Sequence, residues 1–102
     1  MSRAYEWVVE EVNADEDIVE TDAYPTAAAA LTHAHRRPAP GCRFDVGLVL
    51  NIGDDDRGLQ DRQWAYIDDA GFLPEQFDGG ARVPQRFAKE LEAIHFADYG
   101  IN

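Results

Sequence analysis

The sequence contains a single cysteine, Cys42, and a single serine, Ser2, among its 102 residues. One cysteine cannot form an intramolecular disulfide, so a small secreted scaffold held by several disulfides is excluded. A serine at position 2 cannot supply a nucleophile elbow, and the chain has no phosphate-binding glycine loop and no paired cysteines. The sequence therefore lacks the common short motifs of enzymes.

Long hydrophobic runs are also missing. No apolar stretch approaches the length of a membrane span, and glutamates interrupt the apolar residues near the N-terminus before a signal-peptide core forms. We therefore expect a cytoplasmic protein that does not bind membranes. An apolar fraction of 45% is typical of a globular protein. We expect residues 1–102 to form one small domain.

Positive charge is scarce, since nine Lys and Arg face twenty Asp and Glu, and the formal net charge is −11. The acidic residues concentrate in residues 1–24 and 44–78. Such a chain repels phosphate backbones, so we expect no nucleic-acid binding through a basic face. The acidity serves solubility alone, or it attracts a basic partner protein. A lesser alternative is an acidic DNA mimic that occupies a nucleic-acid-binding protein.

The hydrophobic pattern predicts four strands and two helices. Alternating apolar and polar residues predict strands, and apolar residues at helical spacing predict helices. The predicted strands cover residues 4–12, 17–24, 42–53 and 62–68, and the predicted helices cover residues 25–38 and 83–97. This ββαββα order predicts an α+β two-layer sandwich, with an antiparallel sheet of about four strands and both helices packed on one face.

Four side chains carry local predictions for the two helices. The Thr26 hydroxyl is expected to cap the first helix. His33 is expected in a polar last turn, where positive charge complements the negative end of the helix dipole. In the second helix Arg86 and Glu90 are four residues apart, which predicts an ion pair on the outer surface.

The aspartates Asp54, Asp55 and Asp56 follow the third predicted strand and raise the question of a metal site. An EF-hand loop needs oxygen ligands at alternate positions. Gly58 stands where the third ligand should be, and Glu75 is too distant to close the loop. The register fails, so we expect a solvated turn, no metal site and no cofactor.

An aromatic set is the second candidate for function. Arg62, Trp64 and Tyr66 alternate along the fourth strand, and Tyr5 and Trp7 alternate along the first, so the two groups are able to share one surface. If the helices cover that surface it is core, which is the favoured interpretation. If it is open, its aromatic and arginine side chains are typical of a protein interface. Alternation alone does not decide which face is covered.

The leading hypothesis is a non-catalytic interaction module that binds a protein partner or its own copy. Arg62, Trp64 and Tyr66 would form the contact surface, while Asp54, Asp55 and Asp56 steer a basic partner. The alternative is a small-ligand or metal-dependent enzyme, with its pocket between the 70–82 loop and the sheet.

Overall fold

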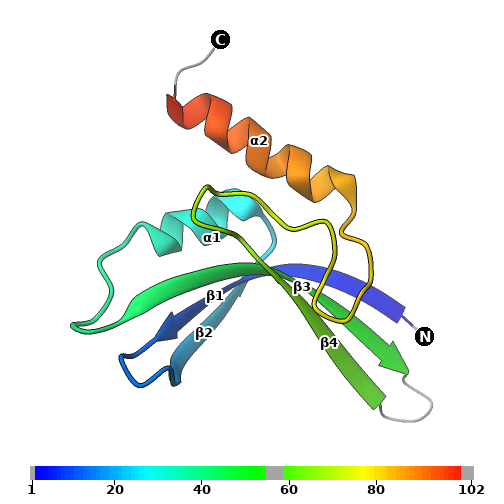
Figure 1. Ribbon diagram of the computed structural model, residues 1–102, viewed down its shortest axis with the longest axis horizontal. Helices are drawn as coiled ribbons and strands as arrows, with labels where there is room; N and C mark the ends of the chain where they lie inside the picture. The colour runs from blue at the N-terminus through cyan, green and yellow to red at the C-terminus, as the bar shows by residue number, and fades with distance from the viewer. Residues whose placement is uncertain (1, 55–58, 100–102) are drawn as a thin grey trace.

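The computed structural model describes the backbone of residues 2–54 and 59–99, and the side chains of residues 4–53 and 61–94. One antiparallel sheet contains β1 (Ser2–Val12), β2 (Ile18–Tyr24), β3 (Arg43–Asp54) and β4 (Leu59–Tyr66), in the order β2-β1-β3-β4. Helix α1 (Ala27–Ala34) follows β2, and helix α2 (Gln85–Tyr99) ends the described chain (Figure 1). The predicted ββαββα order and α+β architecture are confirmed.

Two hairpins, β1–β2 and β3–β4, join through the pairing of β1 with β3. This central pairing is the longest in the sheet and aligns Trp7 with Leu48. It places the two longest and most buried strands in the middle of the sheet and leaves β2 and β4 as its edges. Within β2–β1 the register shifts between Glu11 and Val12, which is an irregularity typical of sheet edges.

The core lies between the sheet and the two helices, on what we name the helix face. Trp7, Leu48 and Leu50 point from the central strands into this layer and are almost completely buried. Ala27 and Ala30 of α1 are fully buried against them, because small side chains let the helix backbone lie close to the sheet. Each fully buried large apolar side chain contributes about 1.5–3 kcal/mol, so this layer supplies most of the stability.

Glu90 joins the two helices to the sheet. Its carboxylate accepts hydrogen bonds from the Ala27 backbone N–H, at 2.7 Å, and from the Trp7 indole N–H, at 3.3 Å. The predicted surface pair with Arg86 is therefore wrong, and the Arg86 guanidinium instead lies 4.8 Å from the Phe87 ring centre. A carboxylate is more valuable at the first turn of α1, where backbone N–H groups have no partner within the helix.

Helix α1 begins as predicted, since the Thr26 hydroxyl accepts a hydrogen bond from the Ala29 N–H at 3.2 Å. It ends at Ala34, earlier than expected. His33 lies in the last turn, as predicted, but it is buried, and its Nδ1 lies 2.6 Å from the Tyr24 hydroxyl. The helical spacing that buries Ala27 and Ala30 also turns position 33 towards the sheet.

Neither α1 nor the described part of α2 combines the length and the apolar character that a membrane crossing requires.

Candidate functional site

The two predicted aromatic groups lie on opposite faces of the sheet. Tyr5 and Trp7 belong to the helix face, where the Tyr5 ring packs 5.0 Å from that of Phe87. The register aligns Ala65 with Leu48, whose side chain points to the helix face. Trp64 and Tyr66, on either side of Ala65 in β4, therefore point away from the helices. A single shared aromatic surface is therefore wrong, as is the favoured assignment of Trp64 and Tyr66 to the helix-covered core.

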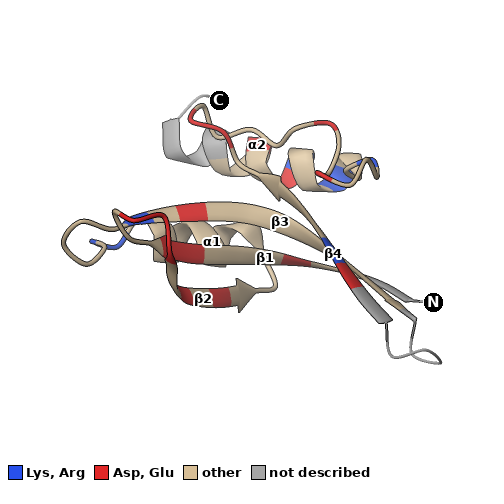
Figure 2. Ribbon diagram, turned by 60° about the horizontal axis from the view of Figure 1, so that its bottom comes forward, with Lys and Arg blue, Asp and Glu red and all other residues tan. Residues whose placement is uncertain are grey.

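The face without helices, which we name the open face, carries the side chains of Arg62, Trp64 and Tyr66 along β4. In Figure 2 the central strands β1 and β3 pass in front of α1. The Trp64 and Tyr66 rings are nearly parallel, with 5.2 Å between their centres and 15° between their planes. The Arg62 guanidinium carbon lies 5.6 Å from the centre of the Trp64 ring. We name these three stacked residues the aromatic ladder.

A glycine on the neighbouring strand makes room for the ladder. Gly47 pairs with Tyr66, and a Cβ atom there would lie 3.2 Å from Trp64 Cε3 and 3.4 Å from Tyr66 Cδ1. The missing side chain lets the rings lean over β3 towards β1. Val8 and Val49, which point to the open face beside them, are consequently 0% exposed although no helix covers them.

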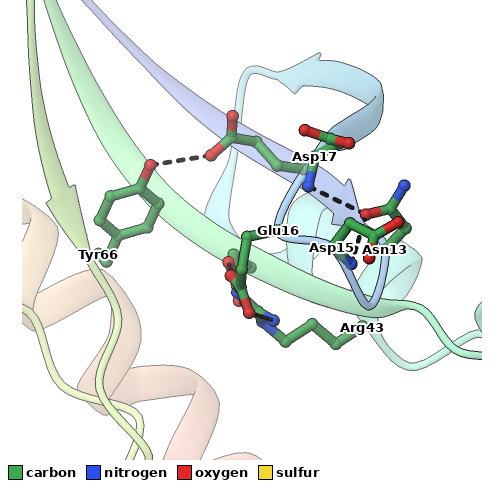
Figure 3. A network of polar contacts seen from close by, with 8 residues as sticks. Asn13, Asp15, Glu16, Asp17, Arg43 and Tyr66 are labelled. Carbon is green, nitrogen blue, oxygen red and sulfur yellow. Dashed lines mark hydrogen bonds and ion pairs between the residues drawn. The ribbon is translucent and has the colours of Figure 1, made fainter.

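Glu10 of β1 holds the Tyr66 end of the ladder. The Tyr66 hydroxyl donates a hydrogen bond of 2.9 Å to Glu10 Oε1, reaching across β3 (Figure 3). Glu10 is buried by this arrangement. Burial of the phenol raises the Tyr66 pKa well above its ordinary value, and the bond to Glu10 and its negative charge raise it further.

Glu6 of β1 holds the Arg62 end. Its Oε1 accepts hydrogen bonds from Asn51 Nδ2 at 3.0 Å and from Arg62 Nη2 at 3.3 Å. The ladder is thus anchored at both ends by glutamates two strands away. Glu6, Glu10 and Gly47 were not among the predicted site residues, although the alternation of glutamates along β1 and a glycine inside β3 were visible signals.

The 76–82 segment covers the outer edge of β4 next to Trp64. The Asp78 N–H donates to the Trp64 carbonyl at 2.9 Å, and Asp78 Oδ1 accepts from the Trp64 N–H at 2.9 Å. Both backbone hydrogen-bonding groups of Trp64 are therefore paired beyond the sheet, which fixes the backbone beneath its indole ring.

Phe77 packs against the sheet in the region where the enzyme hypothesis places a pocket. This side chain is 3% exposed and lies 6.2 Å, centre to centre, from the Tyr5 ring. A hollow of about 690 Å³ lies instead between the loop and the start of α2, with Glu75 and Arg82 in its lining. Within the described side chains, no group of three or more His, Cys, Asp or Glu is placed to hold a metal ion.

The predicted aspartate turn is only partly visible. Asp54 is the last residue of β3, and its backbone pairs with Leu59 at the start of β4. Asp55 and Asp56 lie outside the described residues. Their contribution to binding therefore stays a prediction from the sequence.

Arg43, the first residue of β3, is paired with two acidic side chains. Its guanidinium donates to both carboxylate oxygens of Glu16, at 2.6 and 3.0 Å, and to Asp45 at 3.2 Å (Figure 3). The hydrogen bond and charge of Arg43 lower the Glu16 pKa. These groups are exposed, so we expect a small contribution to stability.

Comparison with known proteins leaves this geometry as the basis for function. No protein-family model, no curated protein and no solved structure matches the chain.

Proposed function

We propose that this domain is a protein-interaction module that binds its partner through the aromatic ladder on the open face. The observation that carries the proposal is the stacked Arg62, Trp64 and Tyr66 set, displayed outside the helix-covered core. Tyr66 is 47% exposed, and Trp64 is half-buried. Trp, Tyr and Arg are the residue types that contribute most to binding energy at protein interfaces.

The ladder is also fixed before any partner arrives. Its ends are hydrogen-bonded to Glu6 and Glu10, and the Trp64 backbone is paired with Asp78. Binding to an ordered surface loses less side-chain entropy, so more of the contact energy appears as affinity. The Trp64 indole N–H makes no hydrogen bond with any described residue, which leaves it available as a donor to the partner.

The charge of the domain favours a basic partner. Acidic residues occur on all four strands (Figure 2), and the net charge is −11. A second copy of the chain carries the same charge, so electrostatic repulsion favours a different protein over self-association. Asp54 ends β3, and Asp55 and Asp56 come next in the sequence; these three acidic residues would add to the attraction. Such steering increases the association rate at low salt.

The first experiment compares partner capture by the wild type, a Trp64→Ala variant and a Phe72→Ala variant. Phe72 is an exposed aromatic residue on the loop and serves as the matched control. We expect partners bound by the wild type and the control to be lost by Trp64→Ala, with affinity reduced about 30-fold, as for a hot spot. Retention of those partners by a folded Trp64→Ala variant would contradict the proposal.

The kinetics test the electrostatic part separately. Once a partner is identified, its association rate should fall as salt rises from about 50 mM to about 500 mM, while the dissociation rate changes little. An association rate that is independent of salt would remove the steering by acidic residues. Sedimentation of the isolated domain tests self-association, and we expect a monomer.

The two other hypotheses from the sequence have direct tests. An ion that binds only the folded enzyme must raise the midpoint of thermal unfolding, so melts with calcium, magnesium, manganese and zinc test metal dependence. For the DNA mimic, DNA should compete with the domain for a captured nucleic-acid-binding partner.

A further inference from the structure

A cleft opens where β4 ends, next to Tyr66. The last backbone bond that continues the β3–β4 pairing runs from the Ile67 N–H to the Val46 carbonyl at 2.9 Å. The chain then turns away, and Asp68 Oδ1 accepts the Ala70 and Phe72 N–H groups at 3.0 and 2.9 Å. In the part of the chain that the structure describes, no strand pairs with residues 43–45 on this side of β3, and a cleft of about 400 Å³ lies there.

The lining of the cleft combines apolar and acidic side chains. Leu31, Phe44, Val46 and Ile67 line the walls, and three of these four are only partly buried. Asp45, Asp68 and Asp69 also line the cleft, and no basic residue occurs in the described lining. The volume lies within the range of small-ligand sites.

The three carboxylates differ in their partners. Asp45 is paired with Arg43 at 3.2 Å, and Asp68 uses Oδ1 for its two backbone bonds. Asp69 is exposed and makes no hydrogen bond or ion pair with any side chain or backbone group that the structure describes. Two of the three therefore have free acceptor oxygens for a ligand.

Tyr66 connects this cleft to the aromatic ladder, because the same ring stacks on Trp64 and lines the cleft. A partner segment lying along the ladder passes the mouth of the cleft. The cleft is therefore a continuation of the proposed contact surface around the end of β4.

We propose that the cleft binds the side chain of an arginine in the partner segment. An arginine places its aliphatic stem against apolar walls while its head stays with the carboxylates of the lining. A planar guanidinium also stacks on aromatic rings, of which Phe44 and Tyr66 line the cleft, and it bonds to more than one carboxylate at once, which lysine does less well. The statement that the arginine belongs to a partner protein rests on the proposed function. The binding of an arginine side chain in the cleft does not.

An NMR titration of the labelled domain with N-acetyl-L-arginine N-methylamide tests this proposal. We expect saturable shifts of the Leu31, Ile67 and Asp69 amides. At equal concentration and ionic strength, the neutral citrulline analogue and the guanidinium ion, which lacks the stem, should bind more weakly. Equal shifts with the citrulline analogue would overturn the role of charge. The corresponding lysine analogue is titrated in the same way, and stronger binding of it than of the arginine analogue would overturn the choice of arginine.

Two variants with the same change of charge locate the site. Asp69→Asn should weaken binding about threefold, as expected for an exposed ion pair. Asp61→Asn removes an exposed aspartate from the far part of β4 and should change nothing. An equal loss in both variants would show attraction by net charge alone and overturn the site.

The outcomes separate this proposal from the proposed function. If a captured partner depends on Trp64 but the arginine probe leaves the cleft amides unshifted, the cleft proposal fails and the interaction module stands. If the probe saturates the cleft but partners ignore Trp64→Ala, the ladder proposal fails and the arginine site stands.

Discussion

The two faces of the sheet bury their inner side chains by different means. On the helix face, Trp7 and Leu48 are covered by separate elements, α1 and α2. On the open face, Val8 and Val49 are equally buried at 0% exposure. Their cover consists of aromatic and glutamate side chains of the sheet itself, which lean over Gly47.

This difference shows how a sheet face is able to stay open without exposing a flat apolar surface. An uncovered row of valines would be a site of nonspecific association. Here the Trp64 and Tyr66 rings approach β3 at Gly47, while Trp64 stays half-buried and Tyr66 stays exposed. The helix face thus contributes mainly to stability and the open face is the proposed binding surface, while the ladder contributes to both.

The sharpest test of the comparison replaces one tryptophan on each face. Trp7→Ala removes a side chain that is 1% exposed and should lower the free energy of unfolding by about 3–5 kcal/mol. Trp64→Ala removes a half-buried ring and should cost about 1–2 kcal/mol. Urea denaturation measures both, and equal losses would show that the ladder is as much core as the helix face.

The second prediction concerns the joint between the helices and the helix face. Glu90→Ala leaves the Ala27 N–H and the Trp7 indole N–H without their acceptor, which should cost about 2–3 kcal/mol. Glu92→Ala, an exposed change on the same helix, should stay within about 0.5 kcal/mol. Similar values for the two variants would show that Glu90 does not join the layers.

The third prediction targets the room beneath the ladder. In Gly47→Val the new side chain meets Trp64 and Tyr66, and this overpacking should cost about 1–3 kcal/mol. The rings must also move, so the NMR signal of the Trp64 indole N–H should shift while that of Trp7 stays. An unchanged Trp64 signal would contradict the account of how the ladder lies over β3.

Local sequence patterns were sufficient to predict the strands and helices, but not which face of the sheet the helices cover. Alternation showed that the side chains of Trp7 and Glu6 point to opposite faces of the sheet, and that Trp64 and Tyr66 share a face. Which of these faces the helices cover depends on the pairing of β1 with β3, which joins residues as distant in the sequence as Ser2 and Gly53. No periodicity within one strand contains that information.

The hydrogen bonds that hold the ladder to glutamates of β1 could not be predicted from the sequence for the same reason. The bond between Tyr66 and Glu10 joins residues 56 positions apart and crosses an intervening strand. It forms only because Gly47 is aligned with both Val8 and Tyr66 in the assembled sheet. The sequence identified Arg62, Trp64 and Tyr66 as a set, while the glutamates that fix them required the strand order.

The smallest predicted effect is a pH dependence that tests whether the open face is sealed. Burial and Glu10 raise the Tyr66 pKa in the folded protein above its ordinary value of 10.0. The folded state therefore holds the phenol proton more tightly than the unfolded state. The resulting stabilisation is complete below about pH 10 and is lost as the pH rises from there towards the folded-state pKa.

A Tyr66→Phe variant removes this titration. It should be less stable than the wild type at neutral pH, because the buried Glu10 loses its donor. The difference in the free energy of unfolding between the two proteins should then narrow from about pH 10 upwards. In the wild type Tyr66 ionises more readily in the unfolded state than in the folded state, which lowers stability, and the variant has no such group. In Glu10→Gln the acceptor stays but the negative charge is gone, so the Tyr66 pKa should fall part of the way towards 10.0. Urea denaturation across this pH range measures the difference, and a constant difference would mean that Tyr66 ionises as freely as in water and that the ladder does not seal the open face.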